Sequence, residues 1–269
     1  MNCSLLSEKL QILHTLETEF LKVSKEAENT RDFKEARALK AKMEQEMEEV
    51  EGLLGFPEIL GLNIEKTIEK NRLFYESKSI NLPSDFAERT KEIWIRNREA
   101  IEEEIKNMKY DRVLIFPDTL PDTVSLHLKM TEGYNPTFEG QNFKDEGSFQ
   151  SSVTTDEGFH ILLLHNAEEI DGNSHLLATK GKSIDELEAI FEKASGLSLS
   201  EYLIFQKMYN EETGKHLDTL LWTFLPKTKS GSRVVNATWY PGNGRLNVGV
   251  HDSGDRYDIR GCRLSRSFE

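Results

Sequence analysis

Cysteine and long apolar runs are scarce in this chain of 269 residues. Its two cysteines, Cys3 and Cys262, lie near opposite ends and provide neither a disulfide framework nor a set of metal ligands. They are compatible with a reducing compartment. No stretch reaches the roughly 18 consecutive apolar residues of a membrane-spanning helix, and the N-terminus lacks the basic segment and apolar core of a signal peptide. We therefore expect a soluble, cytoplasmic protein that does not insert into membranes.

Basic residues are also in deficit, since 34 lysines and arginines face 47 acidic residues and leave a net charge of −13. Nucleic-acid binding needs clustered Lys and Arg to contact phosphates. Only Arg256, Arg260, Arg263 and Arg266 form a local basic series. Their alternating positions suit forked contacts with carboxylates and carbonyls inside a fold, so we prefer a structural role and expect no nucleic-acid partner.

The common catalytic and metal-binding motifs are absent as well. The chain has no Gly-x-Ser-x-Gly, His-Glu-x-x-His or Cys-x-x-Cys. His160 and His165 are five positions apart, and a lone pair at that spacing is more often structural than metal-binding. Gly242-Asn-Gly244 joins two expected strands, which indicates a hairpin turn and not a phosphate loop. We therefore expect no enzymatic activity, no cofactor and no metal.

The aspartates between Asp252 and Asp258 allow a second interpretation. Carboxylates at short spacing are the oxygen ligands that calcium prefers. The segment lacks the twelve-residue loop and terminal Glu of an EF-hand. A turn rich in Asp and Gly is the commoner meaning, and we prefer it.

The N-terminal part has the pattern of a helical hairpin. Ser4–Asn29 carries apolar side chains at helical spacing, and a second stripe runs from Phe33 to Leu54. A short connection between two such helices predicts an antiparallel pair. Two interpretations stay open: an arm that docks a partner or joins copies into a homo-oligomer, or a hairpin that packs on its own domain.

Two further helices complete an expected helical module over residues 1–109. A short one is predicted over Asn63–Tyr75, and a longer one begins at Pro83-Ser84-Asp85 and continues to Lys106. The side chains expected on the buried side of the longer helix are Phe86, Ile93, Trp94, Ile101 and Ile105.

From Tyr110 onwards, strand and helix signals alternate. Short apolar runs predict strands at Arg112–Pro117, Phe159–His165 and Trp222–Leu225, the last ended by Pro226. Helices are expected over Asp122–Met130 and after the capping boxes Ser183–Glu186 and Ser198–Glu201, the last closing near Gly214. Gly133–Thr155 is expected to be a loop, and Lys227–Ser232 a turn. This order predicts an α+β class, with a domain over residues 110–269 built on short antiparallel strands.

The last stretch alternates as a strand does. Leu246, Val248 and Val250 are expected on one, buried side, with Asn247, Gly249 and His251 on the other. From Gly231 to Phe268 the chain has no Lys, Glu, Gln or Met. Strands and turns disfavour Lys and Glu, which is one explanation of this gap.

A family resemblance provides another explanation. The residues that carry it are Trp222-Thr223, Gly231-Ser-Arg-Val-Val235, Trp239, Tyr202–Lys207, Gly214–Asp218 and Arg260-Gly-Cys-Arg-Leu-Ser-Arg-Ser-Phe268. This pattern resembles the C-terminal part of variable proteins of diversity-generating retroelements, which look like a C-type lectin fold of the branch shared with formylglycine-generating enzymes. The closing Gly-x-Arg strand is moderately specific, because related lectin-like folds share it. The N-terminal helices are not part of the resemblance.

The resemblance implies a hypervariable binding face within about residues 234–260. In such systems, adenines of Asn codons are randomised, and changes at the first two bases of AAC or AAT cannot produce Lys, Glu, Gln, Met or Trp. The outward, ligand-binding positions implied here are Thr238, Tyr240, Asn243, Asn247, Gly249, His251, Ser253, Asp255, Tyr257 and Asp258. Those expected to stay fixed are Trp239, Leu246, Val248, Val250, Gly261 and Phe268.

Three functions follow as hypotheses. The first is a receptor-like protein that binds a ligand, expected to be a protein, on a C-type-lectin-like scaffold. The second is a structural or assembly protein in which the helical hairpin drives oligomerisation. The third is a formylglycine-generating type of enzyme, which by the resemblance would need a pair of active-site cysteines, whereas Cys262 has only the distant Cys3.

Overall fold

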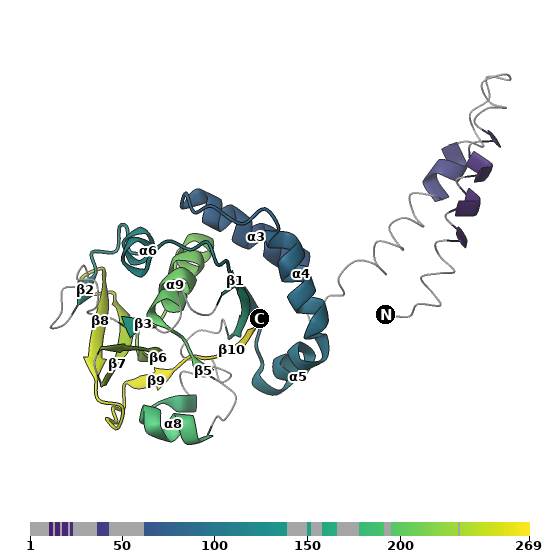
Figure 1. Ribbon diagram of the computed structural model, residues 1–269. Helices are drawn as coiled ribbons and strands as arrows, with labels where there is room; N and C mark the ends of the chain where they lie inside the picture. The colour runs from purple at the N-terminus through teal and green to yellow at the C-terminus, as the bar shows by residue number, and fades with distance from the viewer. Residues whose placement is uncertain are drawn as a thin grey trace. The chain divides into compact units, whose positions relative to one another are not determined.

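The computed structural model describes most of the chain (Figure 1). The described residues are 11–12, 14–16, 18–20, 22–23, 37–42, 62–138, 150–151, 158–165, 178–190, 195–230 and 232–269. The chain divides into two units, Met1–Ile59 and Leu60–Glu269. In the first unit every described residue is helical, as expected for Ser4–Asn29 and Phe33–Leu54. The rest of the predicted hairpin, including its connection, lies outside the described residues.

The second unit is a mixed α+β fold, which confirms the predicted class. Its helices are α3 (Ile64–Ser77), α4 (Phe86–Arg96), α5 (Arg98–Met108), α6 (Thr123–Met130), α8 (Ile184–Ile190) and α9 (Leu199–Thr213). Its strands are β1 (Arg112–Phe116), β2 (Thr137–Phe138), β3 (Gln150–Ser151), β4 (His160–Leu164), β5 (Ser195–Gly196), β6 (Trp222–Ser230), β7 (Arg233–Tyr240), β8 (Arg245–His251), β9 (Arg260–Cys262) and β10 (Leu264–Phe268). None of the helices in the described part of the chain is both long and apolar enough to cross a membrane.

The strands form two sheets. The first has the order β1-β4-β10-β5 and is antiparallel throughout. The second has the order β2-β8-β7-β6-β3, and β9 pairs with β6 beside this path. Its central strand β7 is antiparallel to both β6 and β8, while β2 pairs in parallel with β8 and β9 in parallel with β6.

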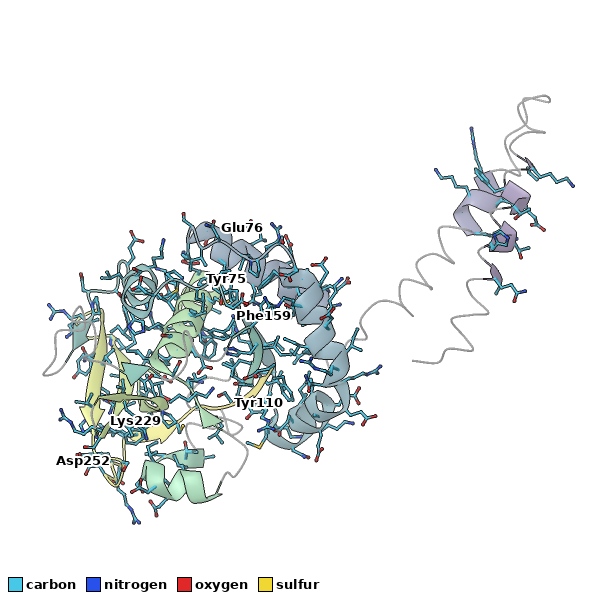
Figure 2. All side chains as sticks on the ribbon, viewed as in Figure 1. Tyr75, Glu76, Tyr110, Phe159, Lys229 and Asp252 are labelled. Atoms are coloured by element: carbon cyan, nitrogen blue, oxygen red, sulfur yellow. The ribbon has the colours of Figure 1, made fainter. Side chains whose placement is uncertain are left out.

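Helix α3 covers the edge of the first sheet. The amide of Ile115 in edge strand β1 donates to Oδ1 of Asn71 (3.1 Å), and its carbonyl accepts from the hydroxyl of Tyr75 (2.8 Å; Tyr75 is labelled in Figure 2). These bonds satisfy backbone groups that an open edge would present to another chain. Helices α3, α4 and α5 accordingly belong to the same compact unit as the sheets, whereas the sequence suggested a boundary at residues 109–110.

The single helix expected from Pro83 to Lys106 is divided at Asn97. This residue has φ −103° and ψ 13°, ends α4 and precedes α5. Its side-chain amide donates to the carbonyl of Ile93 (3.0 Å), which satisfies a carbonyl at the end of α4. The side chains expected on the inner side are buried nonetheless: Phe86, Ile93, Trp94, Ile101 and Ile105.

Strand β6 continues through Pro226 to Ser230. The strand end expected at Leu225 is therefore wrong, and so is the turn expected over most of Lys227–Ser232. The register between β6 and β7 shifts between Leu225 and Lys229, and such an irregularity accommodates a proline, which cannot donate to the ladder. The expected loop over Gly133–Thr155 likewise contains the short strands β2 and β3.

The two capping boxes, the end of α9 at Gly214 and the hairpin turn expected at Gly242–Gly244 are confirmed. Ser183 and Glu186 exchange hydrogen bonds at the start of α8, and Ser198 and Glu201 form a capping box at α9. Gly214 ends α9 with φ 70°. The turn between β7 and β8 is formed by residues 241–244, with φ 63° at Gly244.

Helix α9 lies between the two sheets (Figure 1). Ten of its residues are buried, as is typical of a helix enclosed on all sides. Its apolar residues share one core cluster with Leu114 and Leu162 of the first sheet and with Val235 and Leu246 of the second. The two sheets are therefore held together through α9.

A buried ion pair joins the C-terminal strands to the segment after α9. Arg263, between β9 and β10, donates from Nε (2.9 Å) and Nη2 (2.7 Å) to Oδ1 of Asp218, and both side chains are buried. Asp218 has φ 54°. Its carbonyl accepts from the amide of Trp239 (2.9 Å) and the hydroxyl of Thr238 (2.6 Å) on β7.

We expect Arg263→Met to lower the free energy of unfolding by about 3–5 kcal/mol, because it leaves the Asp218 charge buried without its partner. The exposed pair Arg256–Glu186 (2.7 Å) provides a matched control. Arg256→Met should leave stability unchanged, since exposed ion pairs contribute little. Urea unfolding followed by circular dichroism measures both variants. Equal, small losses would contradict the role given to the buried pair.

Candidate ligand-binding face

The pairing of β7 with β8 determines which side chains share a face. Thr238 lies opposite Asn247 and Trp239 lies opposite Leu246, and directly paired residues of antiparallel strands point to the same side. Trp239, Leu246 and Val248 belong to the core cluster, so the alternation predicted for β8 is confirmed on its inner side. We call the opposite side of β6, β7 and β8 the outer face. Its positions on β7 and β8 include Asn236, Thr238, Tyr240, Asn247, Gly249 and His251.

The ten side chains expected to point outward divide into three groups. Exposed are Tyr240, Asn243, Tyr257 and Asp258. Half-buried are Asn247, His251, Ser253 and Asp255. Buried are Thr238 and Gly249. Of the positions expected to point inward, those buried are Trp239, Leu246, Val248, Gly261 and Phe268, and Val250 is half-buried.

Thr238 lies on the outer side of the sheet, as expected, but it is buried and does not face solvent. Its hydroxyl lies 2.6 Å from the carbonyl oxygen of Asp218 and 3.1 Å from that of Leu221. The segment 218–221 therefore crosses the outer face at Thr238 and covers it. The threonine satisfies backbone carbonyls of an irregular segment, a requirement that strand alternation does not reveal.

Arg260 lies on the outer face beside Asn236, the residue opposite Gly249. With the Asn236 amide nitrogen donating to the carbonyl of Gly249 (3.3 Å), the Asn236 oxygen accepts from Nε of Arg260 (3.2 Å). The guanidinium carbon lies 3.7 Å from the ring centre of Tyr257 and 5.8 Å from that of Trp222. Stacking of a guanidinium on aromatic rings stabilises both groups, and it leaves Arg260 buried.

His251, Asp255 and Tyr257 meet beside Arg260. The rings of His251 and Tyr257 pack edge to face with their centres 5.4 Å apart. The Tyr257 hydroxyl donates to Oδ2 of Asp255 (3.3 Å), and Nδ1 of His251 lies 4.0 Å from the same oxygen. The structure thus brings together three of the side chains predicted to point outward, from the end of β8 and the loop after it.

The loop between β8 and β9, residues 252–259, begins with a turn. The amide of Asp255 donates to the carbonyl of Asp252 (3.1 Å), which confirms the turn expected there (Asp252 is labelled in Figure 2). The carbonyl of Ser253 accepts from the amide of Ile184 at the start of α8 (3.0 Å). Among the residues that the structure describes, no group of three or more His, Cys, Asp or Glu side chains could hold a metal ion.

Two further contacts hold this loop in place. Arg256 pairs with Glu186 of α8 (2.7 Å). At the other end, the carbonyl of Ile259 accepts from the amide of Trp222 in β6 (2.8 Å). Because the loop is fixed to a helix on one side and to a strand on the other, its exposed side chains are presented on a defined backbone.

Three side chains near this loop were not identified from the sequence. Leu220 and Ile259 are exposed, and Trp222 is half-buried. Leu220 lies in the segment that covers Thr238, and Ile259 ends the loop. An aliphatic residue outside a periodic segment carries no local signal of exposure, so only contacts between distant parts of the chain reveal these positions.

Two histidines outside the outer face are held uncharged at neutral pH. Nε2 of His127 lies 2.9 Å from the hydroxyl of Ser200, and burial lowers the pKa of His127 to about 4. His216 stacks on Trp239 with ring centres 3.4 Å apart. Burial and the charge of Lys207 lower the pKa of His216 to about 4. Both packing arrangements indicate structural roles.

Glu201 is buried at the first turn of α9. Its Oε2 accepts from the amide of Ser198 (2.7 Å), and its Oε1 lies 3.1 Å from Nζ of Lys227 and 3.7 Å from Nε2 of His160. Burial raises the pKa of this carboxyl, but His160, Lys227 and the Ser198 amide together outweigh burial and hold the pKa below its usual value. His160 and His165 are both buried, as the structural interpretation of this pair requires.

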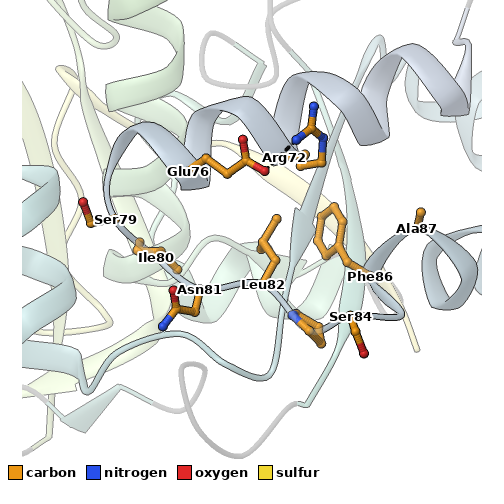
Figure 3. A pocket seen from close by; sticks show the side chains of 10 residues that line it. Arg72, Glu76, Ser79, Ile80, Asn81, Leu82, Ser84, Phe86 and Ala87 are labelled. Atoms are coloured by element: carbon orange, nitrogen blue, oxygen red, sulfur yellow. Dashed lines mark hydrogen bonds and ion pairs between the residues drawn. The ribbon is translucent and has the colours of Figure 1, made fainter.

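An open pocket with a volume of about 610 Å³ lies between the end of α3 and the start of α4 (Figure 3). The apolar side chains in its lining include Ile80, Leu82 and Phe86. The lining cation Arg72 is already paired with both Glu69 and Glu76 at 2.6 Å. None of the side chains predicted to bind a ligand lines this pocket, and we assign no ligand to it.

Glu201→Gln tests the buried carboxylate through its pH dependence. Because the pKa of Glu201 is lowered on folding, its ionised form stabilises the fold above the unfolded pKa of about 4.3. This contribution disappears as the pH falls through the lower folded value. We therefore expect Glu201→Gln to be less stable than wild type at pH 7 and to lose less stability on acidification. Urea unfolding at a series of pH values measures this. The exposed Glu103→Gln is the control, and a wild-type pH profile in Glu201→Gln would contradict the assignment.

Comparison of the chain with protein-family models, with curated proteins and with solved structures found no match. The resemblance to variable proteins of diversity-generating retroelements therefore rests on the sequence motifs alone. The structure by itself establishes a mixed α+β fold with N-terminal helices followed by antiparallel and mixed sheets.

Proposed function

We propose that this chain is a receptor-like protein that recognises another protein through the exposed part of the outer face and the 252–259 loop. The observation that carries the proposal is the cluster of His251, Asp255 and Tyr257 on the side of the sheet opposite Trp239, Leu246 and Val248. Flat aromatic groups beside hydrogen-bonding groups, held on a defined backbone, are the usual components of a protein-binding surface.

The packing of β8 on the core allows the side chains on its outer side to vary. Leu246 and Val248 anchor β8 to the core from its other side, so outward residues of β8 can change while the strand keeps its packing. We therefore propose that the scaffold is of the C-type lectin kind and that the outward positions are diversified, as in variable proteins of diversity-generating retroelements.

The absence of Lys, Glu, Gln and Met from residues 231–268 is stronger evidence for diversification at exposed positions than at buried ones. In β9 and β10 most side chains are buried, and burial alone disfavours charged residues there. At exposed positions such as Tyr240, Asn243 and Asp258, burial gives no such reason. The gap at these positions supports substitution of Asn codons. Ile259 is also a product that such codons reach, which adds this exposed residue to the candidate set.

The enzymatic alternative gains no support from the one described cysteine. Cys262 is buried, and burial, with a smaller effect of the Asp218 charge, raises the pKa of its thiol to about 12. A thiol with that pKa stays protonated at neutral pH and is a poor nucleophile. Cys3 lies outside the described residues. The assembly alternative concerns the N-terminal helices, which are also largely outside them.

Sequencing the DNA that flanks this gene tests the diversification directly. We expect a near-copy of the segment encoding Val234–Arg260 beside a reverse transcriptase gene, with differences confined almost entirely to adenines. Absence of any copy would contradict diversification and leave a binding face with fixed side chains.

Combined replacement of Tyr240, His251 and Tyr257 with Ala tests the binding face. We expect loss of binding to the protein partner recovered with the wild-type chain, measured by surface plasmon resonance. The loss of stability should stay within about 2 kcal/mol, because the main interaction removed from the fold is the stacking on Arg260. Thr238→Val is the opposite case: it should lower stability by about 0.5–1.5 kcal/mol through the loss of a buried hydrogen bond and leave binding intact. A collapse of stability in the triple variant would show that these residues belong to the core.

A further inference from the structure

The outer face and its loop carry a concentration of exposed apolar side chains. Seven large hydrophobic side chains are exposed in the described part of the chain, and four of them lie here: Leu220 (65% exposed), Tyr240 (54%), Ile259 (53%) and Tyr257 (38%). Their placement follows from backbone contacts. The segment containing Leu220 bonds to Thr238 on the outer face, and Ile259 bonds to Trp222 in β6. Tyr240 lies at the far end of β7, whereas Leu220, Tyr257 and Ile259 lie near Trp222 and Arg260, and such a gathering of apolar groups marks an interaction site.

Carboxylates border this apolar surface on one side. The 252–259 loop contains Asp252, Asp255 and Asp258, which are exposed or half-buried. Its single cation, Arg256, is paired with Glu186 at 2.7 Å. The charge of Arg260 lies beneath the Tyr257 ring and is buried. The charge that the loop presents to a partner is therefore predominantly negative.

The far end of the outer face differs in charge. Arg245 is exposed at the start of β8, opposite Tyr240. It stands six residues from His251, or about 20 Å along an extended strand. At that distance, its charge is screened from the loop by physiological salt. Lys180 and Lys182 flank Gly181, which lies beside Asp258, so Asp252 and Asp255 provide the negative charge at the His251 end.

We propose that the binding face selects a protein segment in which Arg or Lys side chains flank an apolar side chain. This inference rests on the proposed function and specifies the partner's chemistry. The apolar side chain packs on Leu220 and Ile259, which removes apolar surface from water. A guanidinium or ammonium group of the partner pairs with Asp255 or Asp258 and packs on the exposed part of the Tyr257 ring. Anionic segments are repelled by the same carboxylates.

Three aromatic probes of similar size test the charge preference on the full-length protein: benzamidine, benzyl alcohol and benzoate, which are cationic, neutral and anionic. Titrations followed by NMR shifts of the backbone amides of residues 251–260 measure affinity and location together. We expect benzamidine to bind at these residues at least about tenfold more tightly than benzoate, with benzyl alcohol between them.

Two variants assign that preference to particular side chains. Combined Asp255→Asn and Asp258→Asn should reduce benzamidine affinity by about fivefold or more without affecting benzyl alcohol. Asp85→Asn, an exposed aspartate at the start of α4 without a side-chain capping bond, is the matched control and should change nothing. Combined Leu220→Ala and Ile259→Ala should weaken benzamidine and benzyl alcohol alike.

The outcomes separate the two proposals. Equal affinity for the three probes at residues 251–260 would overturn the cation preference and leave the binding face in place. Shifts confined to other parts of the molecule, or no shifts at all, would count against the face itself and therefore against both proposals.

Discussion

The buried pair of Asp218 and Arg263 is the interaction on which the outer face depends. A carboxylate removed from water is tolerated only when its charge is compensated, and Arg263 provides that compensation from the C-terminal strands. With its side chain held there, the Asp218 backbone carbonyl is placed to accept from Trp239 and Thr238 of β7. The path of the 218–221 segment, the cover over Thr238 and the position of Leu220 all follow from this single placement.

The requirement that a buried charge be compensated also applies to helix α9 and links it to the rest of the unit. Because it is enclosed on nearly all sides, its polar residues need partners inside the fold, and Glu201 finds them in Ser198, Lys227 and His160. Lys227 lies in β6 and His160 in β4, so one buried carboxylate links the two sheets at the start of the helix. The outer face is therefore backed by a sheet that is tied both to the core and to the neighbouring sheet. Side chains on such a support lose little further freedom on binding.

Features with a local physical cause could be predicted from the sequence. The capping boxes at Ser183 and Ser198, the turn at Gly244 and the inward alternation of Leu246 and Val248 each depend on residues within a few positions of one another. The failures have distant causes. Thr238 follows the outward period of its strand but is covered by a segment that Asp218 positions. Pro226 lies inside β6 because the register with β7 shifts around it. Helix α3 joins the second unit through Ile115, some forty residues further along the chain. The candidate cluster falls between these cases: each of its residues was identified, but their meeting over Arg260 was not.

The kinds of charged residue in the 252–259 loop carry a last implication for the proposed function. The 252–259 loop obtains its negative charge from Asp and not from Glu, and its only cation is Arg and not Lys. Asp has fewer rotatable bonds than Glu and loses less conformational entropy when it is fixed. The guanidinium of an Arg side chain is planar and stacks on aromatic rings, as that of Arg260 does on Tyr257. A randomised Asn codon reaches Asp and excludes Glu and Lys, so a diversifying mechanism of that kind would restrict the carboxylates of the surface to the side chain that is less costly to immobilise. Affinity would then require few contacts, which suits a surface whose side chains must serve different partners.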